Sequence, residues 1–276
     1  MSHKLISISL FSGIGAFELA SKLVFAENEY QTFQFVEINS HAQRVLRSQF
    51  PNIPVWSDIC TYHPPAPRQL GFPTVVVGGF PCTGTSNAGK RNGLNHPESN
   101  LWWQMYRVIL EFRPDFVIVE NPEGIIHRGL QTILGAFKLG GYQTEVEIIS
   151  AAELGAPHER NRVFVIGHCN NLSLQQRQGW RCWDEQVREH IAIARQIIKY
   201  PQTQPLSVPL DDGVSRYLAG LSYAGWWKQN SPPVESGVQP MSRGRREIIN
   251  LVGRSIVPLQ AAVALMRVKF LVELLG

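Results

Sequence analysis

The sequence predicts an α/β fold in which a mostly parallel sheet is covered by helices. Short β-rich runs alternate with helical patterns through the first two thirds of the chain, which is typical of crossover βαβ units. Apolar residues recur at helical spacing from 100 to 112, so this segment is predicted to be a helix packed on the sheet. The predicted strands are residues 5–10, 34–38, 74–77, 116–119, 145–149 and 163–166.

The last third of the chain has a different organisation. After Gly167 a polar stretch leads to a predicted helix near 184–199, and prolines, glycines and serines then recur from 200 to 244. Residues 255–275 return to helical periodicity and are apolar enough to pack on the first domain. We therefore expect residues 1–167 and 250–276 to form the main domain, and residues 168–249 to form a small irregular subdomain.

Composition excludes several classes of protein. A chain of 276 residues with 44% apolar and 17% charged residues can bury a full core. Neither a membrane span nor a signal peptide is recognisable, so a cytoplasmic protein without membrane contact is expected. The four cysteines are far apart, which predicts neither a disulfide framework nor a metal site. A net charge of +4 is compatible with a polyanionic partner but is a weak indication by itself.

The first candidate site follows the first predicted strand. This strand runs into FSGIGAFE, where Gly13 and Gly15 form a turn before a helix, the usual place for a ligand in an open α/β fold. Such a turn is equally consistent with tight packing, since the third glycine of the dinucleotide fingerprint is missing. Glu37 ends the next strand and could accept hydrogen bonds from ribose hydroxyls, or be a solvated carboxylate. Asp58 could accept from an adenine amino group while Ile59 covers the ring, or could be a turn or cap aspartate.

The second candidate site follows the third strand, in the segment VVVGGFPC. Pro81 restricts the loop and holds Cys82 at the carboxyl end of the sheet. A lone cysteine is usually an inert small hydrophobe, but the surrounding loop is rich in Gly, Ser, Thr and Asn and is unlike a core.

Charged residues occur at the same predicted edge. Glu120 follows the strand 116–119, where a partly apolar cleft could keep its carboxyl group protonated near neutral pH, although a solvated glutamate is an equally good interpretation. Arg160 and Arg162 precede the last strand, and their spacing in extended chain directs both guanidinium groups to one side. Two guanidinium groups on one face suit a phosphate or a base carbonyl.

The order of these motifs closely resembles the cytosine-C5 DNA methyltransferase family, in particular its compact phage-like or solitary members. The motifs are FSGIGAFE, FVEIN, SDI, GGFPC, GLNHPESNLWW, VENPEG, APHERNRVFVIG and GRSIVP, and they cover residues 5–167 and about 250–275. The resemblance implies a Rossmann-like fold that binds S-adenosylmethionine (AdoMet), with a small target-recognition region at 168–249.

The resemblance also implies roles for individual residues. It implies catalysis by Cys82, Glu120, Arg160 and Arg162, without a metal. It implies contacts with AdoMet, and with the product S-adenosylhomocysteine (AdoHcy), from Phe11, Gly13, Gly15, Glu37, Ile38, Asp58, Ile59, Pro81, Leu101 and Ser255. It implies contacts with double-stranded DNA from Ser86, Arg91, Arg243, Arg245 and Arg246. We expect a monomer, and the sequence leaves open the target sequence and whether a cognate restriction endonuclease accompanies the protein.

The chain departs from the family pattern at five positions. Bulky Arg254 replaces the usual asparagine beside the cofactor pocket, and Glu98 reverses the charge of a common arginine in the loop that closes over DNA. The other departures are Thr83 for glutamine, Pro122 for valine and His158 for glutamine.

Three alternatives remain open from the sequence. A tRNA cytosine-C5 methyltransferase would keep the chemistry, but the extra signatures of that branch are missing from the variable region. A catalytically weakened homologue would bind DNA without methyl transfer. Evidence against it is that the catalytic residues Cys82, Glu120 and Arg162 are all present. A nicotinamide oxidoreductase would use the glycine turn but gives no reason for Pro81-Cys82 or for the arginine pair.

Overall fold

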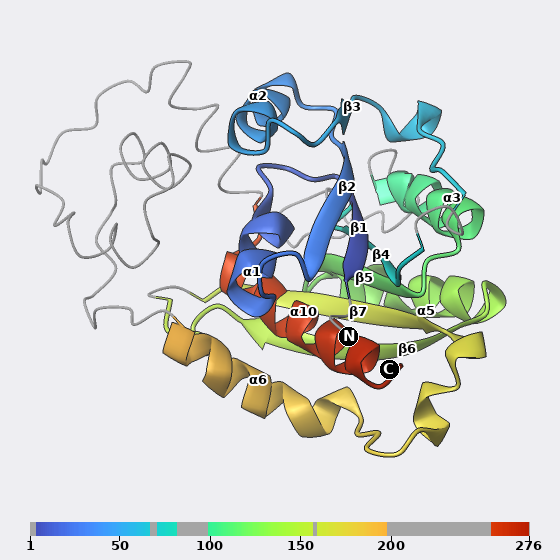
Figure 1. Ribbon diagram of the computed structural model, residues 1–276, viewed down its shortest axis with the longest axis vertical. Helices are drawn as coiled ribbons and strands as arrows, with labels where there is room; N and C mark the ends of the chain where they lie inside the picture. The colour runs from blue at the N-terminus through green and yellow to red at the C-terminus, as the bar shows by residue number, and fades with distance from the viewer. Residues whose placement is uncertain (1–3, 67–70, 82–98, 157–158, 198–254, 276) are drawn as a thin grey trace, which may run out of the picture.

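The computed structural model of the protein describes residues 4–66, 71–81, 99–156, 159–197 and 255–275 (Figure 1). Within these residues the chain builds a seven-stranded sheet in the order β3-β2-β1-β4-β5-β7-β6. β1 to β5 are parallel neighbours, β7 is antiparallel to β5, and β6 is antiparallel to β7. The strands are β1 (Leu5–Leu10), β2 (Tyr30–Val36), β3 (Val55–Trp56), β4 (Thr74–Gly78), β5 (Phe116–Pro122), β6 (Tyr142–Ser150) and β7 (Asn161–Cys169).

This sheet confirms the predicted α/β fold, and each predicted strand is present. β2 begins earlier than expected and already ends at Val36, so Glu37 and Ile38 lie just beyond the strand. The chain leaves β1 outward to β2 and β3, and then returns to place β4 on the other side of β1. The carboxyl ends of β1 and β4 therefore flank a topological switch point, where open α/β sheets bind their ligands.

Helices cover both faces of the sheet (Figure 1). On one face α3 and α5 pack on a cluster that includes Val76, Val117 and Val165, and on the other face α1, α6 and α10 pack on a second cluster. The helices are α1 (Ala16–Val24), α2 (Ser40–Gln49), α3 (Trp102–Phe112), α4 (Ile125–Arg128), α5 (Leu130–Leu139), α6 (Trp183–Ile197) and α10 (Pro258–Glu273). Short 3₁₀ helices are η1 (Ile59–Thr61), η4 (Ser99–Leu101), η5 (Asn170–Leu172) and η6 (Leu174–Gln176).

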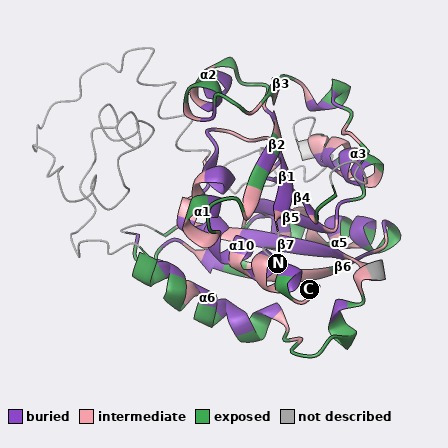
Figure 2. Ribbon diagram, viewed as in Figure 1, coloured by how far each residue is buried: buried purple, intermediate pink, exposed green. Residues whose placement is uncertain are grey.

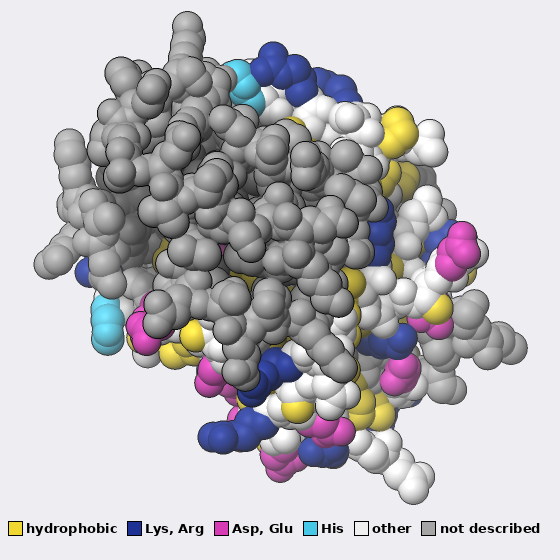
Figure 3. All heavy atoms as spheres, turned by 90° about the vertical axis from the view of Figure 1, so that its left-hand side faces the viewer, with side chains coloured by type: hydrophobic (Ala, Val, Ile, Leu, Met, Phe, Trp, Pro, Cys, Tyr) yellow, Lys and Arg dark blue, Asp and Glu magenta, His cyan; other side chains and the backbone are white. Residues whose placement is uncertain are grey.

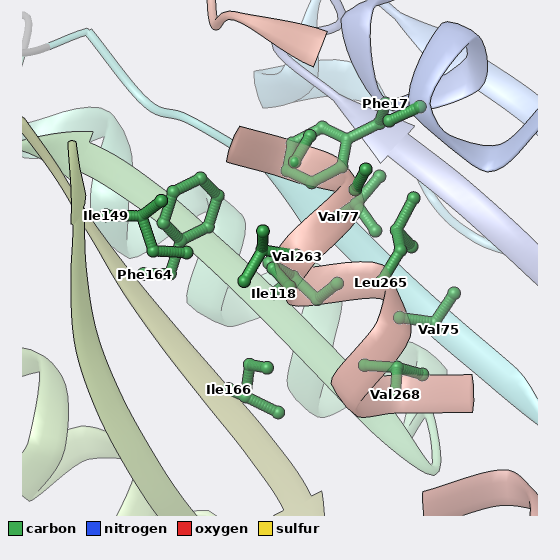
Figure 4. Packing of buried hydrophobic residues seen from close by; sticks show 14 of the residues in the cluster. Phe17, Val75, Val77, Ile118, Ile149, Phe164, Ile166, Val263, Leu265 and Val268 are labelled. Atoms are coloured by element: carbon green, nitrogen blue, oxygen red, sulfur yellow. The ribbon is translucent and has the colours of Figure 1, made fainter. Parts of the chain in front are cut away.

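α10 closes the second cluster. Pro258 is its first residue, a position that tolerates proline because the missing N–H would have no partner in the helix. Figure 4 shows Val263, Leu265 and Val268 of this helix meeting strand residues such as Val75 and Ile118. The C-terminal helix is therefore a part of the core on which the sheet depends, as its apolar periodicity predicts.

α6 also belongs to this core, although the sequence places residues 168–197 in the small subdomain. Trp183 and Val187 of α6 lie in the same cluster as α10, while the opposite side of the helix is exposed (Figure 2). The fully buried Arg267 of α10 donates to both carboxylate oxygens of Glu145, at 2.6 and 2.8 Å, and to Gln186 of α6. The observed packing does not follow the predicted boundary at residue 167. The edge strand β6 needs a cover on this face of the sheet, and α6 supplies it.

Charge is distributed unevenly over the described surface. Basic side chains gather at the end of the molecule where α2 lies, whereas acidic and basic side chains alternate near α6 (Figure 3). A mixture of both signs is typical of a solvated helix face. Within the described ranges we find no helix that is both long and apolar enough to cross a membrane.

Candidate active site

The glycine turn after β1 forms one wall of the candidate site. Phe11, Gly13 and Gly15 have φ angles of 52°, 55° and 86°, so the backbone reverses through left-handed conformations. A Cβ on Gly15 would lie 2.7 Å from the Phe50 ring, which explains a glycine there. Among the described residues, apart from its two neighbours in the chain, no heavy atom lies within 4 Å of a Cβ built at Gly13, so there is open space here. The turn thus packs on the Phe50 ring at Gly15 and is open at Gly13, toward the edge of the sheet.

Glu37 fixes the position of this turn. Its Oε2 accepts a hydrogen bond from the Gly13 N–H at 2.8 Å, and its Oε1 accepts one from the Asn39 N–H at 2.8 Å. Burial raises the pKa of this carboxyl group, and the backbone donors oppose that shift. The structure therefore brings together Gly13 and Glu37, two of the residues that the sequence assigns to cofactor binding.

Apolar side chains stand beside this carboxylate. The Glu37 N–H donates to the carbonyl of Trp56 at 2.9 Å, which places the end of β2 next to β3. Ile38 is 74% exposed and Trp56 is 45% exposed, so both present apolar surface at this edge. Ile59, which was expected to cover a ring, is only 5% exposed and packs with the core under α3.

Asp58 begins the turn that follows β3. Its Oδ1 accepts a hydrogen bond from the Cys60 N–H at 2.8 Å and so caps η1. Phe11 and Leu101 are partly buried against the cluster that contains Ile59, while Pro81 is half-buried. Apart from Ser255, which lies before α10, the residues assigned to cofactor binding thus come from the ends of β1, β2, β3 and β4 and from the start of α3.

Glu120 and Arg162 form the charged centre of the site. The Arg162 Nε donates to Glu120 Oε1 at 2.7 Å, and both side chains are largely buried. Antiparallel pairing of β5 with β7 produces this contact, since Pro122 lies opposite Arg162 in the register. Pro122, a departure from the family pattern, therefore lies within the strand that presents Glu120.

The pKa of Glu120 is set by burial. Desolvation raises it from 4.5 to about 7, and the charges of Arg162 and Arg160 only partly oppose this shift. Although the arginine contact favours the anion, burial dominates, so a large fraction of Glu120 is protonated near neutral pH. A carboxyl group with this raised pKa can hold a proton near neutral pH.

Arg160 occupies a different position from Arg162. Its Nη2 donates to the carbonyl of Ser255 at 2.7 Å, and its own carbonyl accepts from the buried Gln260 side chain at 2.7 Å. Arg160 thus links the start of β7 to the segment before α10, while its charge still acts on Glu120. Ser255, assigned to the cofactor, donates through its hydroxyl to the carbonyl of Ile256 at 3.3 Å.

Two residues to which the sequence assigned no role complete this part of the site. A Cβ on Gly79 would overlap Glu120 Oε2, so only glycine lets the loop after β4 pass this carboxyl group. Asn121 donates to the carbonyl of Phe80 at 3.3 Å, which ties β5 to the residue before Pro81. The paired glycines before Pro81 were a usable signal for Gly79, whereas nothing in the sequence indicates the Asn121 contact.

Several assigned residues lie outside the described part of the chain. They are the nucleophile candidate Cys82, the DNA-contact candidates Ser86, Arg91, Arg243, Arg245 and Arg246, and four departures from the family pattern, Thr83, Glu98, His158 and Arg254. The described residues reach Pro81, which directly precedes Cys82.

The described edge fits a nucleoside-bearing cofactor such as AdoMet. Glu37 and Asp58 supply acceptor carboxylates, and Ile38 and Trp56 supply exposed apolar surface for a planar ring. The open space at Gly13 leaves room for close approach to the backbone. These features agree with the chemistry of an adenosine group.

Together the sheet order and the candidate site at its carboxyl edge define a Rossmann-like fold with a site for a nucleoside-bearing ligand. A solved structure of the methyltransferase EhMeth from Entamoeba histolytica matches the fold with a TM-score of 0.61 at 12% identity, and the match covers 98% of each chain. The profile of the C-5 cytosine-specific DNA methylase family matches residues 5–211, and the chain belongs to this family.

Curated relatives agree with this membership over part of their length. The type II methyltransferase M.CviJI of Paramecium bursaria Chlorella virus IL3A is 33% identical over 136 residues, which are 48% of this chain and 36% of the relative. The orphan methyltransferase M.SPRI of Bacillus phage SPR is 30% identical over 181 residues, 59% of this chain and 38% of the relative. The chain thus spans less than half the length of these two relatives.

Proposed function

We propose that the protein is a DNA (cytosine-5-)-methyltransferase, which transfers a methyl group from AdoMet to C5 of a flipped cytosine in a specific sequence of duplex DNA. The observation that carries the proposal is the buried Glu120 carboxyl group, bound by Arg162 and packed against Gly79, three residues before Cys82. Family membership supports the same activity.

In the proposed reaction the Cys82 thiolate adds to C6 of the cytosine while Glu120 gives a proton or a hydrogen bond to N3. This addition makes C5 nucleophilic. AdoMet, when bound, supplies the electrophilic methyl group that C5 takes. Loss of the C5 proton to a base then restores the double bond and expels Cys82 as a thiolate. A Glu120 pKa of about 7 suits this role, since the group can both hold and release a proton near neutral pH.

Arg162 has three tasks in this proposal. It orients Glu120 through the Nε contact, and its remaining guanidinium donors hold the cytosine O2. Its positive charge also favours the thiolate of Cys82, because a free thiol with a pKa of about 8.5 is only slightly ionised at pH 7. The cytosine must leave the duplex for these contacts, at a cost of about a few kcal/mol that the pocket contacts offset.

The remaining assignments belong to the same proposal. Glu37 and Asp58 bind the ribose and the adenine of AdoMet, with Phe11, Gly13, Gly15, Ile38, Ile59, Pro81, Leu101 and Ser255 around them. Target recognition falls within residues 168–249, and the residues that contact duplex DNA are Ser86, Arg91, Arg243, Arg245 and Arg246. Basic contacts with phosphate make the binding weaken as salt rises. The proposed protein is a monomer.

Base-resolution bisulfite sequencing tests this function directly. Wild type and Cys82→Ala are expressed in a bacterial host without cytosine methylation. We expect protected cytosines in one short sequence context with wild type, and none with Cys82→Ala. Protection that persists in Cys82→Ala would contradict the covalent mechanism. Full conversion with soluble wild-type protein would contradict the DNA activity, and bisulfite sequencing of the host RNA would then show whether RNA is the substrate.

A further inference from the structure

The turn that carries Asp58 is held from outside by one side chain of α3. The Arg107 Nη2 donates to the carbonyl of Ile59 at 2.7 Å and to the carbonyl of Tyr62 at 3.0 Å. Figure 1 shows α3 beside the segment that follows β3. Arg107 thus reaches across from the helix and binds the backbone of the turn itself.

The guanidinium group of Arg107 has one fixed orientation. Its Nε donates to Gln104 Oε1 at 2.9 Å, and its Nη1 donates to Glu111 Oε1 at 2.9 Å. Glu111 is in turn 3.1 Å from His63 Nδ1, on the chain just beyond the turn. Because partners on both sides hold its plane, Arg107 presents Nη2 to the two carbonyls without rotational freedom.

This turn has little stability of its own. η1 contains three residues, and such a short 3₁₀ helix leaves carbonyl groups without partners at its end. Asp58 caps its beginning by accepting from the Cys60 N–H, and Arg107 binds its end. The Trp56 indole donates to Thr61 Oγ1 at 3.1 Å as a third attachment. Arg107 is therefore the attachment that joins the turn carrying Asp58 to α3.

Arg107 also joins two parts of the candidate cofactor site. α3 begins directly after Leu101, and the turn at its other side carries Asp58 and Ile59. Both segments were assigned to AdoMet, but nothing in their sequence indicates what sets the distance between them. The hydrogen bonds from Arg107 to the turn supply that constraint.

We propose that Arg107 is a positioning residue that places Asp58 to accept a hydrogen bond from the adenine amino group of AdoMet, so that it controls adenine selectivity without touching the reacting atoms. The inference rests on the proposed function. Lysine cannot replace this arginine, because one ammonium group cannot donate in the same plane to Ile59, Tyr62, Gln104 and Glu111.

The test compares two ligands by isothermal titration calorimetry. AdoHcy carries the adenine amino group, and S-inosylhomocysteine has a carbonyl oxygen in its place. We expect wild type to bind AdoHcy at least about tenfold more tightly than S-inosylhomocysteine. Arg107→Met and Arg107→Lys should lose most of this preference, because they should weaken the binding of AdoHcy and leave that of S-inosylhomocysteine unchanged. The KM for AdoMet should rise by a similar factor, while kcat at saturation stays within about threefold.

Arg113→Met is the matched control. Arg113 lies at the end of the same helix and donates to a backbone carbonyl, that of Gly140, at 2.7 Å. It makes an equivalent bond to a different part of the chain, so its loss should leave the ligand preference unchanged. In addition, Arg107→Met in an Asp58→Asn background should change the preference no further, because the two residues act through one contact.

The outcomes separate this inference from the proposed function. A folded Arg107→Met that keeps the wild-type preference, or that loses affinity for both ligands equally, overturns the positioning role. If Arg107→Met does not fold, as seen by thermal unfolding, Arg107→Lys decides by the same criterion. Wild type that binds AdoHcy but methylates no DNA would overturn the DNA activity and still allow this test. Wild type that binds neither ligand would overturn both.

Discussion

Two buried carboxyl groups of this protein have the same raised pKa in different surroundings. Burial raises the pKa of Glu18, in the first turn of α1, and of Glu120, near the end of β5, from 4.5 to about 7 in each case. At Glu18 only weaker hydrogen bonds oppose this rise in pKa, among them that from the Thr32 hydroxyl at 3.4 Å. At Glu120 the positive charges of two arginines oppose it. A raised pKa therefore does not by itself indicate catalysis, and the neighbours of the carboxyl group decide its role.

The first test of this comparison replaces each of the two glutamates, Glu18 and Glu120, by glutamine, which cannot ionise. We expect Glu120→Gln to lower the single-turnover rate of methyl transfer by about 10²- to 10⁴-fold, because the amide cannot give a proton to the base. Glu18→Gln should leave the rate within about threefold. AdoHcy affinity should stay close to wild type in both variants. Similar rates for the two variants would remove the distinction between the two carboxyl groups.

A second test moves Glu120 without changing it. In Gly79→Ala the new Cβ would overlap Glu120 Oε2 and lie 3.1 Å from the Glu120 carbonyl oxygen, so the carboxyl group must shift. We expect a rate loss of about tenfold or more, since such displacements cost catalytic alignment. If a folded Gly79→Ala variant reacts at the wild-type rate, the position of the Glu120 carboxyl group is not critical for methyl transfer.

Gly135→Ala is the control for an added methyl group. Gly135 lies inside α5 with no heavy atom within 4 Å of a Cβ, so alanine should fit there. It should stabilise the fold by about 0.5–1 kcal/mol through helix propensity and leave the rate unchanged. Urea denaturation and the single-turnover assay measure the two effects.

The last test concerns stability against pH. A raised pKa means that the folded state holds the Glu18 proton more tightly than the unfolded chain. The stability that this provides is complete below pH 4.5 and is lost as the pH rises through about 7. Because glutamine does not titrate, the stability of Glu18→Gln relative to wild type should increase by about 2 to 3 kcal/mol between pH 5 and pH 8.

Chemical denaturation of both proteins at several pH values measures this difference. A difference that does not change with pH would show that Glu18 is not buried as a titrating acid.

The sequence predicts the strands and the residues at their ends well, because strand signals are local. The apolar run before Gly78 and the glycine turn after Leu10 suffice to place Gly13, Glu37 and Glu120 at one edge of the sheet. The ion pair of Glu120 with Arg162 was not predicted, because it depends on β7 returning antiparallel beside β5.

Contacts between distant segments could not be predicted in the same way. Arg107 acts through backbone carbonyls, which every residue carries and no sequence pattern identifies. Residues 168–249 were assigned to a separate subdomain because the alternating pattern breaks after Gly167, whereas the packing of α6 with α10 on one face of the sheet is a tertiary contact. The burial of Glu18 depends on β2 passing beside α1, a tertiary contact outside any local motif.

The packing of α10 has a consequence for the synthesis of the protein. Lys269 of this helix donates to the carbonyl of Val24, 245 positions earlier, and α10 fills the core on the face of the sheet that includes Val75 and Val77. While a ribosome is still translating residues 1–250, α1 and α6 can cover only their own parts of that apolar face, and the part under α10 stays exposed. The nascent chain must therefore stay protected from aggregation until α10 emerges, and its folding should be slow for its size.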